Sequence, residues 1–343
     1  MSSSPHILVI GFGAIGAFFA SRLASIPGVR ISAICRSNYE IVKEKGIRVT
    51  SPTFKEVILK PTYVFASNDE ARRTKQRDGI IWSHLFIATK VLPELGDPAA
   101  LLDGLVDPDT TIVIPQNGLG IEEPYHTRFP HHPIISATTR TSVTQSSPGH
   151  IEHKHWTRTT IGPYAPPTGS DLATKRTAEF IALLHKAGIP DIDHLDHTGM
   201  QFARWHKTAI NAAMNPTSVL ARGSNTLCPT NQAMGLDTSV REHMKAVMKE
   251  ILHAATVVLG KPLPESLPSP EDVFEGVKMD VSGSRPSMWV DWEAGRRVEV
   301  EAILGEVVRR ARAVGCEVPR TESLYALLRM AQGLRLGQGT NVE

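Results

Sequence analysis

The sequence predicts an α/β N-terminal domain with a mainly parallel sheet, followed by an all-α C-terminal domain. The 343 residues exceed what one hydrophobic core normally organises. In the first half, short β-branched apolar runs alternate with stretches of helical spacing, which is typical of a parallel sheet covered by helices. After Asp196 the pattern is helical throughout, so we expect domains at residues 1–196 and 197–343.

The first half begins with HILVI at His6–Ile10, an apolar run that predicts a strand, and helical spacing follows at Ala17–Ala24. We expect further strands at 29–35, 57–59, 64–66, 80–88 and 111–115, and helices at 38–45 and 98–105. Between residues 133 and 162, β-branched and polar residues alternate, which predicts strands that extend the sheet, some of them antiparallel. Asp171–Ala187 is predicted to be a helix that stops at Gly188.

The second half predicts a series of helices joined by a proline-rich connection at 262–270. The expected helices are 199–220, 231–259, 270–278, 299–314 and 321–332.

Composition excludes several function classes. A formal net charge of +2 without a basic stripe argues against nucleic acid as a partner. The basic run between Arg72 and Arg77 is interleaved with acids, which indicates a solvated loop or helix face, with phosphate contact as the alternative. Three scattered cysteines suit a reducing compartment, and no apolar stretch reaches the ~20 residues of a membrane span. We expect a cytoplasmic protein with no membrane partner.

The residues after the first strand form a glycine fingerprint, G-x-G-x-x-G. Its six residues are Gly11, Phe12, Gly13, Ala14, Ile15 and Gly16. In this motif the first glycine makes the tight turn, the second lets the backbone approach a pyrophosphate, and the third lets the helix pack on the strand. Its position between a strand and a helix predicts a Rossmann dinucleotide-binding domain.

Arg36, at the end of the second expected strand, indicates which dinucleotide is bound. Enzymes that use NAD tend to place Asp or Glu there, whereas this chain has Arg36-Ser37-Asn38. An arginine with small polar neighbours suits a 2′-phosphate, which predicts NADPH as the cofactor. The alternative is an ordinary surface arginine.

Polar residues recur along one expected helix. Lys207, Asn211 and Asn215 stand at i, i+4 and i+8, so they project from nearly one face. Asparagines are mediocre helix formers, so their placement beside a lysine is not explained by helix propensity. An ammonium and two amides can bind a hydroxylated carboxylate and deliver a proton. A solvent-exposed stripe is the alternative.

Together with the glycine fingerprint and this helix, IPQNG (114–118) and PSMWVDWEAGRRVEVEAILG (286–305) make the chain resemble the ketopantoate reductase family. The resemblance extends from about residue 6 to residue 328. The combination of K-x-x-x-N-x-x-x-N-P with S-M-x-x-D-x-x-x-G-R-x-x-E is highly specific to that family. It implies NADPH reduction of 2-dehydropantoate, or of a related carbonyl substrate, in a cleft between the two domains.

The resemblance also implies roles for single residues. Lys207 would be the general acid, and Glu299 would hold the substrate hydroxyl, orient the lysine and contribute to the cofactor site. The substrate-binding residues would be Asn117, Asn211, Asn215, Asn225 and Ser287. Asn117 would also lie near the nicotinamide ribose, and Lys90 would lie by the cofactor.

One segment departs from the family pattern. Where members commonly carry T-T-T-H or T-T-S-H, this chain has Ala137-Thr-Thr-Arg-Thr141, so the histidine is absent and the substrate is left open. The alternatives are a same-fold reductase of another ketone, lactone or imine, and a non-catalytic NADP(H)-sensing protein. The histidines 150, 153 and 155 lack accompanying ligands, so no metal is expected. A homodimer is a possible assembly.

Overall fold

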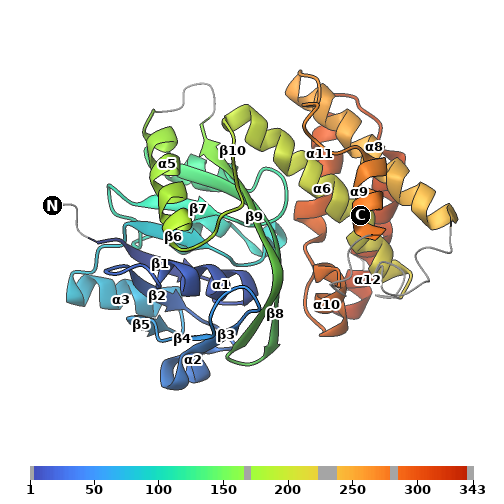
Figure 1. Cartoon of the computed structure of the whole chain (residues 1–343). Helices are drawn as coiled ribbons and strands as arrows, with labels where there is room; N and C mark the ends of the chain where they lie inside the picture. The colour runs from blue at the N-terminus through green and yellow to red at the C-terminus, as the bar shows by residue number, and fades with distance from the viewer. Residues whose placement is uncertain (1–3, 166–170, 223–237, 279–284, 338–343) are drawn as a thin grey trace. The chain divides into compact units, whose positions relative to one another are not determined.

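A block of parallel strands forms the centre of the N-terminal sheet. The computed structural model describes residues 4–165, 171–222, 238–278 and 285–337, and Figure 1 shows its helices and strands. Within those ranges the strands are β1 (His6–Ile10), β2 (Arg30–Ile34), β3 (Ile47–Thr50), β4 (Val57–Leu59), β5 (Tyr63–Phe65), β6 (His84–Ile87), β7 (Thr111–Ile114), β8 (Ile134–Ser147), β9 (His150–Tyr164) and β10 (Ile192–His194). The block β5-β2-β1-β6-β7-β8 is parallel throughout. Its strands follow the order 3-2-1-4-5-6, which is that of a doubly wound dinucleotide-binding domain.

Beyond β8 the sheet continues through a long hairpin. β8 pairs antiparallel with β9, which in turn pairs in parallel with β3 and β10, and β3 pairs antiparallel with β4. The expectation that residues 133–162 extend the sheet with antiparallel strands is therefore confirmed. β3 and β10 are short strands that the sequence pattern did not predict.

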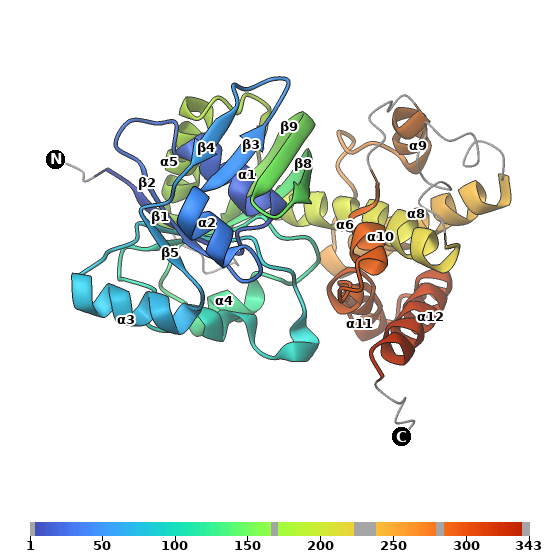
Figure 2. The same cartoon turned by 90° about the horizontal axis from the view of Figure 1, so that it is seen from below.

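Helices cover both faces of this sheet. They are α1 (Ala14–Leu23), α2 (Tyr39–Lys45), α3 (Asn68–Asp78), α4 (Glu123–Arg128) and α5 (Asp171–Lys186), with 3-10 turns η1 (Pro93–Leu95) and η2 (Pro98–Leu102). α1 and α5 contact each other and the hairpin strands, and Figure 2 shows α3 and α4 on the opposite side of the strands. The core beneath α1 includes Ile7, Phe18 and Leu23, which are fully buried. Each buried side chain of this size contributes roughly 1.5–3 kcal/mol.

The expected strand at 80–88 is wrong in its first half. Gly79 has φ +64°, and the Ile80 amide donates to the Lys75 carbonyl at 3.1 Å, which closes the end of α3. This is the bond of a helix C-terminal cap, so Ile80 belongs to the cap of α3. The strand proper, β6, begins at His84.

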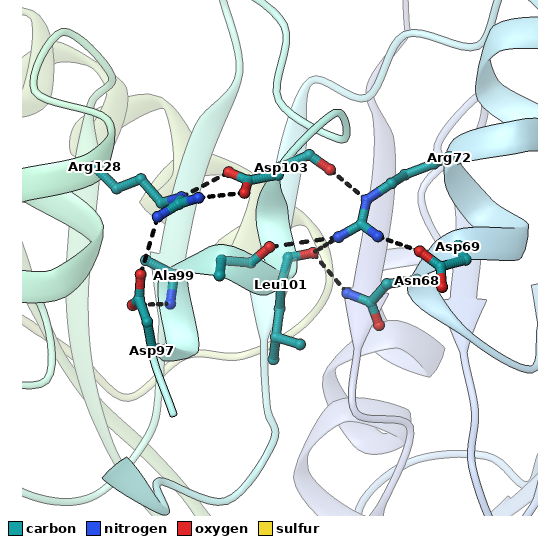
Figure 3. Close-up of polar contacts among 9 residues, drawn as sticks. Asn68, Asp69, Arg72, Asp97, Ala99, Leu101, Asp103 and Arg128 are labelled. Carbon is teal, nitrogen blue, oxygen red and sulfur yellow. Dashed lines mark hydrogen bonds and ion pairs between the residues drawn. The ribbon is translucent and has the colours of Figure 1, made fainter. Parts of the chain in front are cut away.

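The expected helix at 98–105 is a short 3-10 turn, η2, that side chains of α3 hold in place (Figure 3). Arg72 donates to the Asp103 carbonyl at 2.5 Å and to the Leu101 carbonyl at 3.3 Å, and Asn68 donates to the Leu101 carbonyl at 2.7 Å. The turn therefore relies on tertiary hydrogen bonds, which no local pattern reveals. The basic run of the sequence lies in α3, where Arg72 and Lys75 are bound and not simply solvated.

The second half is helical, so the fold class, an α/β Rossmann domain plus an all-α domain, is confirmed. Its described helices are α6 (His197–Leu220), α8 (Thr238–Leu259), α9 (Pro270–Lys278), α10 (Ser287–Glu293), α11 (Glu306–Ala313) and α12 (Pro319–Arg335), with a π-helical turn η4 (Glu301–Gly305) before α11. The expected helix at 299–314 therefore begins with a π turn. Among the described helices, none has both the length and the apolarity that a bilayer span requires.

The described chain divides into two compact units. The first unit comprises Met1–Lys90, Asp97–Gln116 and Ile121–Met200, and the second comprises Val91–Gly96, Asn117–Gly120 and Gln201–Glu343. Two short segments from the first half thus belong with the helices. Leu119, for example, is 4% exposed and lies in the core that α6 and α8 form. The division falls inside α6, and the boundary expected at residue 196 stays a prediction.

Candidate functional site

The glycine turn of the first unit has the geometry that a dinucleotide needs. Gly11 has φ +94°, and a Cβ built there would lie 2.6 Å from the Thr89 amide nitrogen. A Cβ at Gly16 would collide with the Gly11 carbonyl oxygen, whereas no atom lies within 4 Å of a Cβ at Gly13. Gly11 thus makes the tight turn, Gly13 leaves the approach to the backbone open, and Gly16 allows the helix to pack closely, which are the functions of the three glycines in this fingerprint.

The N-terminus of α1 is electrostatically suited to a phosphate. No side chain caps this helix at Gly13, and no acidic residue lies in its first turn. Its first amides are therefore directed toward the open space above Gly13, and the helix dipole favours negative charge there. The residues present fit the pyrophosphate of a dinucleotide.

The turn after β2 exposes a positive charge. Arg36 and Ser37 are exposed, whereas Asn38 is 5% exposed. The Tyr39 amide donates to the Arg36 carbonyl at 3.4 Å, which closes a four-residue turn. The preceding Cys35 thiol is buried, which raises its pKa to about 12, so it stays protonated and inert.

The ends of β6 and β7 are joined beside the glycine turn. The Gln116 side-chain amide donates to the Thr89 carbonyl at 2.6 Å and to the Thr89 hydroxyl at 3.1 Å. Lys90 follows directly and is half-buried. The carboxyl ends of the parallel strands β1, β6 and β7 thus present Gly11, Lys90 and Gln116 at one edge of the sheet, where ligands of doubly wound domains bind.

In the second unit, the polar face of α6 is only partly accessible. Lys207 and Asn211 are half-buried, and Asn215 is 5% exposed. The helix continues through Pro216, and the Ser218 hydroxyl donates to the Asn215 carbonyl at 2.6 Å. The burial is inconsistent with a purely solvent-exposed stripe, because such a stripe would leave all three side chains in water.

The segment that carries Asn117 is tied to two elements of the same unit. The Arg204 guanidinium of α6, which is 1% exposed, donates to the Gly118 carbonyl at 3.5 Å. The Leu119 amide donates to the Ala302 carbonyl of η4 at 3.3 Å. Asn117 therefore lies in a segment fixed between the helix of Lys207 and the turn that follows Glu299.

Glu299 contacts the segment Val91–Gly96, which belongs to the same unit. One of its carboxylate oxygens, Oε1, accepts a hydrogen bond from the Val91 amide at 2.9 Å. The π turn η4 follows, and its first residue, Glu301, accepts from the Tyr325 hydroxyl at 2.9 Å. π turns inside α-helices occur frequently at functional sites, where they change the direction of neighbouring side chains.

The structure therefore groups the predicted residues by unit. Gly11–Gly16, Arg36 and Lys90 lie in the first unit, while Asn117, Lys207, Asn211, Asn215, Ser287 and Glu299 lie in the second. Ser287 is exposed at the start of α10, and Asn225 lies outside the described residues. Sequence reasoning missed Arg204 and Gln116. Gln116 lies in the IPQNG segment and Arg204 lies three residues before Lys207, but only their contacts reveal what they hold.

Comparisons with known proteins cover nearly the whole chain. Residues 7–166 match the family model "Ketopantoate reductase PanE/ApbA", and residues 199–332 match its C-terminal counterpart. The 2-dehydropantoate 2-reductase of Nostoc sp. is 29% identical over 333 residues, 97% of each chain. The crystal structure of 2-dehydropantoate 2-reductase from Methylococcus capsulatus is 34% identical, with a TM-score of 0.78 over 98% of this chain and 99% of that one.

A more distant structure shares the fold alone. D-mandelate dehydrogenase, solved with NADH and anilino(oxo)acetate, is 17% identical, with a TM-score of 0.76 over 96% of this chain and 99% of that one. The fold and the site together define a pyridine-nucleotide-dependent oxidoreductase with a Rossmann and an all-α domain. Because the two family models together match almost the entire chain, the protein belongs to the ketopantoate reductase family.

Proposed function

We propose that the protein catalyses the NADPH-dependent reduction of 2-dehydropantoate (ketopantoate) to pantoate. The full-length similarity to the 2-dehydropantoate 2-reductase of Methylococcus capsulatus, at 34% identity, supports this reaction most directly. The half-buried face of Lys207, Asn211 and Asn215 gives it a chemical basis.

For the cofactor, we propose that the glycine turn and the α1 N-terminus hold the pyrophosphate, and that Arg36 pairs with the 2′-phosphate. Arg36 is exposed on the four-residue turn after β2, and no acidic residue stands there to bind ribose hydroxyls. Lys90 and Asn117 would complete the site. When bound, NADPH would supply a hydride to the keto carbon of the substrate.

Proton transfer is the contribution proposed for Lys207. As negative charge grows on the keto oxygen, the Lys207 ammonium stabilises it and donates a proton to that oxygen. Glu299 holds the substrate hydroxyl and orients the lysine. Its carboxylate is already fixed on one side by the Val91 amide at 2.9 Å, which limits its rotation. Asn211, Asn215, Asn225 and Ser287 would bind the remaining substrate oxygens.

The decisive measurement is the absorbance of NADPH with and without ketopantoate. We expect substrate-dependent oxidation, and we expect Lys207→Ala to lower kcat by about two to four powers of ten while the Kd of NADPH stays nearly unchanged. Lys186→Ala, an exposed lysine on α5, serves as the matched control and should leave kcat unchanged. Near-normal kcat in Lys207→Ala would remove this lysine from the mechanism.

A second candidate is reduction of another ketone, lactone or imine on the same fold. Thr141, in the segment that departs from the family pattern, has a buried hydroxyl with no hydrogen-bond partner within residues 4–165 or the other described ranges. That hydroxyl could bind a polar group that ketopantoate lacks. A substrate panel tests this: if a cyclic or aryl ketone exceeds ketopantoate in kcat/KM, the named reaction fails. Binding of NADPH without turnover of any substrate would favour the sensing protein.

Two further expectations stay predictions. Analytical ultracentrifugation would test the homodimer, and fractionation of cells that express the chain would test a cytoplasmic location.

A further inference from the structure

Asn38 is the N-cap residue of α2, but its side chain does not cap the helix. Asparagine is among the preferred N-cap residues because its side-chain oxygen normally accepts from the first turn. Here the Asn38 side chain is 5% exposed and is directed into the domain. The helix therefore forgoes a stabilising bond, and the amide is used elsewhere.

The Asn38 amide connects the turn of Arg36 to the glycine fingerprint. Its nitrogen, Nδ2, donates to the carbonyl of Phe12, between the first two glycines, at 3.3 Å. Asn38 also belongs to the four-residue turn that Arg36 begins and the Tyr39 amide closes at 3.4 Å. One side chain thus links the backbone that would receive the pyrophosphate to the turn that presents Arg36.

Gln145 of β8 completes the arrangement from 107 residues further along the chain. Asn38 Nδ2 donates to Gln145 Oε1 at 3.2 Å, and Gln145 Nε2 donates back to Asn38 Oδ1 at 2.9 Å. The two amides therefore form a reciprocal pair, and with the bond to Phe12 both hydrogens of the Asn38 amide are used.

The end of the β8–β9 hairpin supports this pair by packing on α2. Gly149, with φ +78°, approaches Ile41 so closely that a Cβ there would lie 2.9 Å from Ile41 Cδ1. The Gly149 carbonyl accepts from the Arg48 amide at 2.9 Å, which fixes the hairpin end to β3. The end of the hairpin, four residues after Gln145, is thus fixed against both α2 and β3.

We propose that Asn38 and Gln145 are positioning residues that set NADPH selectivity, by fixing the Arg36 turn at a constant distance from the glycine turn. The inference rests on the proposed function, because it assumes that Arg36 meets the 2′-phosphate. Pyrophosphate and 2′-phosphate are joined through one ribose by only a few bonds, which limits the distance between them, so a shift of one turn against the other weakens the contact to the second phosphate. NADH has no 2′-phosphate, and its binding depends far less on where Arg36 lies.

The test is the Kd of each cofactor, measured without substrate by fluorescence titration. Gln145→Met keeps the side-chain bulk and removes both hydrogen bonds to Asn38. We expect the Kd of NADPH to rise about tenfold and that of NADH by less than about twofold, given the modest net value of neutral hydrogen bonds. The matched control is Thr144→Ala, an exposed neighbour that faces the other side of β8 and should change neither Kd.

A second arm separates the inference from the cofactor assignment. Arg36→Ala should abolish the preference for NADPH, and Gln145→Met should then have no further effect on the ratio of the two Kd values. If Arg36→Ala leaves the preference intact, the proposed cofactor assignment and the inference both fail. Suppose instead that Arg36→Ala abolishes the preference, but Gln145→Met raises the Kd of both cofactors equally or changes neither. The positioning role is then overturned, and the cofactor assignment stands.

Discussion

The three glycines of the fingerprint are required for different reasons, which allows cofactor binding to be separated from folding. At Gly13 the backbone has φ −86°, which any residue adopts, and no atom lies within 4 Å of a built Cβ. We therefore expect Gly13→Val to fold normally but to bind NADPH at least about tenfold more weakly, because the side chain fills the space above the α1 amides. Thermal unfolding with and without NADPH measures both effects. The mutant should keep its Tm but lose the increase that the cofactor gives.

Gly11→Ala is the contrasting variant for this prediction. Its φ of +94° is unfavourable for alanine, and the added methyl would lie 2.6 Å from the Thr89 amide nitrogen. The Tm should therefore fall even without cofactor. Equal loss of stability in the two variants would contradict the assignment of separate roles.

At the residue scale, the sequence could identify residues whose chemistry is local to a motif. Gly11, Gly13 and Gly16 follow from the spacing alone, and the structure gives each the backbone geometry or close packing that the motif predicts. Asn38 shows the limit. The sequence places it at the start of an expected helix, but its side-chain partners are Phe12 and Gln145, and a contact across 107 residues leaves no local signal.

At the scale of elements, η2 shows how side chains of one helix can stabilise a short turn (Figure 3). Arg72 of α3 donates to the main-chain carbonyls of Asp103, Leu101 and Ala100, at 2.5, 3.3 and 3.4 Å, and pairs with Asp69. Arg72→Ala should lower the free energy of unfolding by about 1–3 kcal/mol, because several carbonyls lose their donor at once. Urea unfolding measures this change.

Two other arginines serve as comparisons for that prediction. Arg128 of α4 donates to the carboxylates of Asp103 and Asp97, and because its side chain is 39% exposed, Arg128→Ala should cost no more than about 1 kcal/mol. Arg77 is 72% exposed and pairs, among the residues that the structure describes, with its neighbour Asp78, so Arg77→Ala should be nearly neutral. If Arg72→Ala is no worse than Arg77→Ala, the bonds to η2 contribute nothing measurable.

Helices and strands could be predicted from the sequence where their apolar residues recur at the spacing of that element. The parallel strands and the long helices follow from apolar spacing, whereas η2, β3 and the π turn η4 do not. η2 depends on Arg72 and Asn68, β3 is a short strand that pairs with β9 about 100 residues away, and η4 is a local distortion within a helical pattern. Because η2 and β3 depend on tertiary contacts, the sequence pattern predicted a longer helix in place of η2 and no strand at β3.

At the scale of the whole molecule, two segments of the first half belong to the second unit. Composition marks the change to helices near residue 196, but Val91–Gly96 and Asn117–Gly120 resemble ordinary loops between strands. They are assigned by distant contacts, such as Val91 to Glu299 and Leu119 to Ala302. As a result, Asn117 lies in the same unit as Lys207, which strand order alone would not suggest.

The overall stability of the first unit should depend on pH through histidines buried in its sheet. His84 of β6 is 9% exposed, and burial, together with the charge of Arg176, lowers its pKa to about 4, while Glu179 opposes this shift. His6 of β1 is 3% exposed, and burial and Arg30 lower its pKa to about 4 as well. The unfolded chain binds these protons near the ordinary pKa of about 6.5.

The contribution of these histidines to the free energy of unfolding is therefore fully present above about pH 6.5 and is lost as the pH falls toward 4. The reason is that the unfolded chain binds protons in this range, whereas the buried histidines of the folded chain do not. For His84 the loss amounts to about 3 kcal/mol across that interval. Urea midpoints between pH 7 and pH 4 should fall accordingly. In His84→Phe, which places an aromatic ring beside Phe180 without a titrating group, the fall should be smaller. The exposed His185→Gln on α5 should retain the full pH dependence, and an equal slope in the wild type and both variants would show that His84 does not control the acid sensitivity.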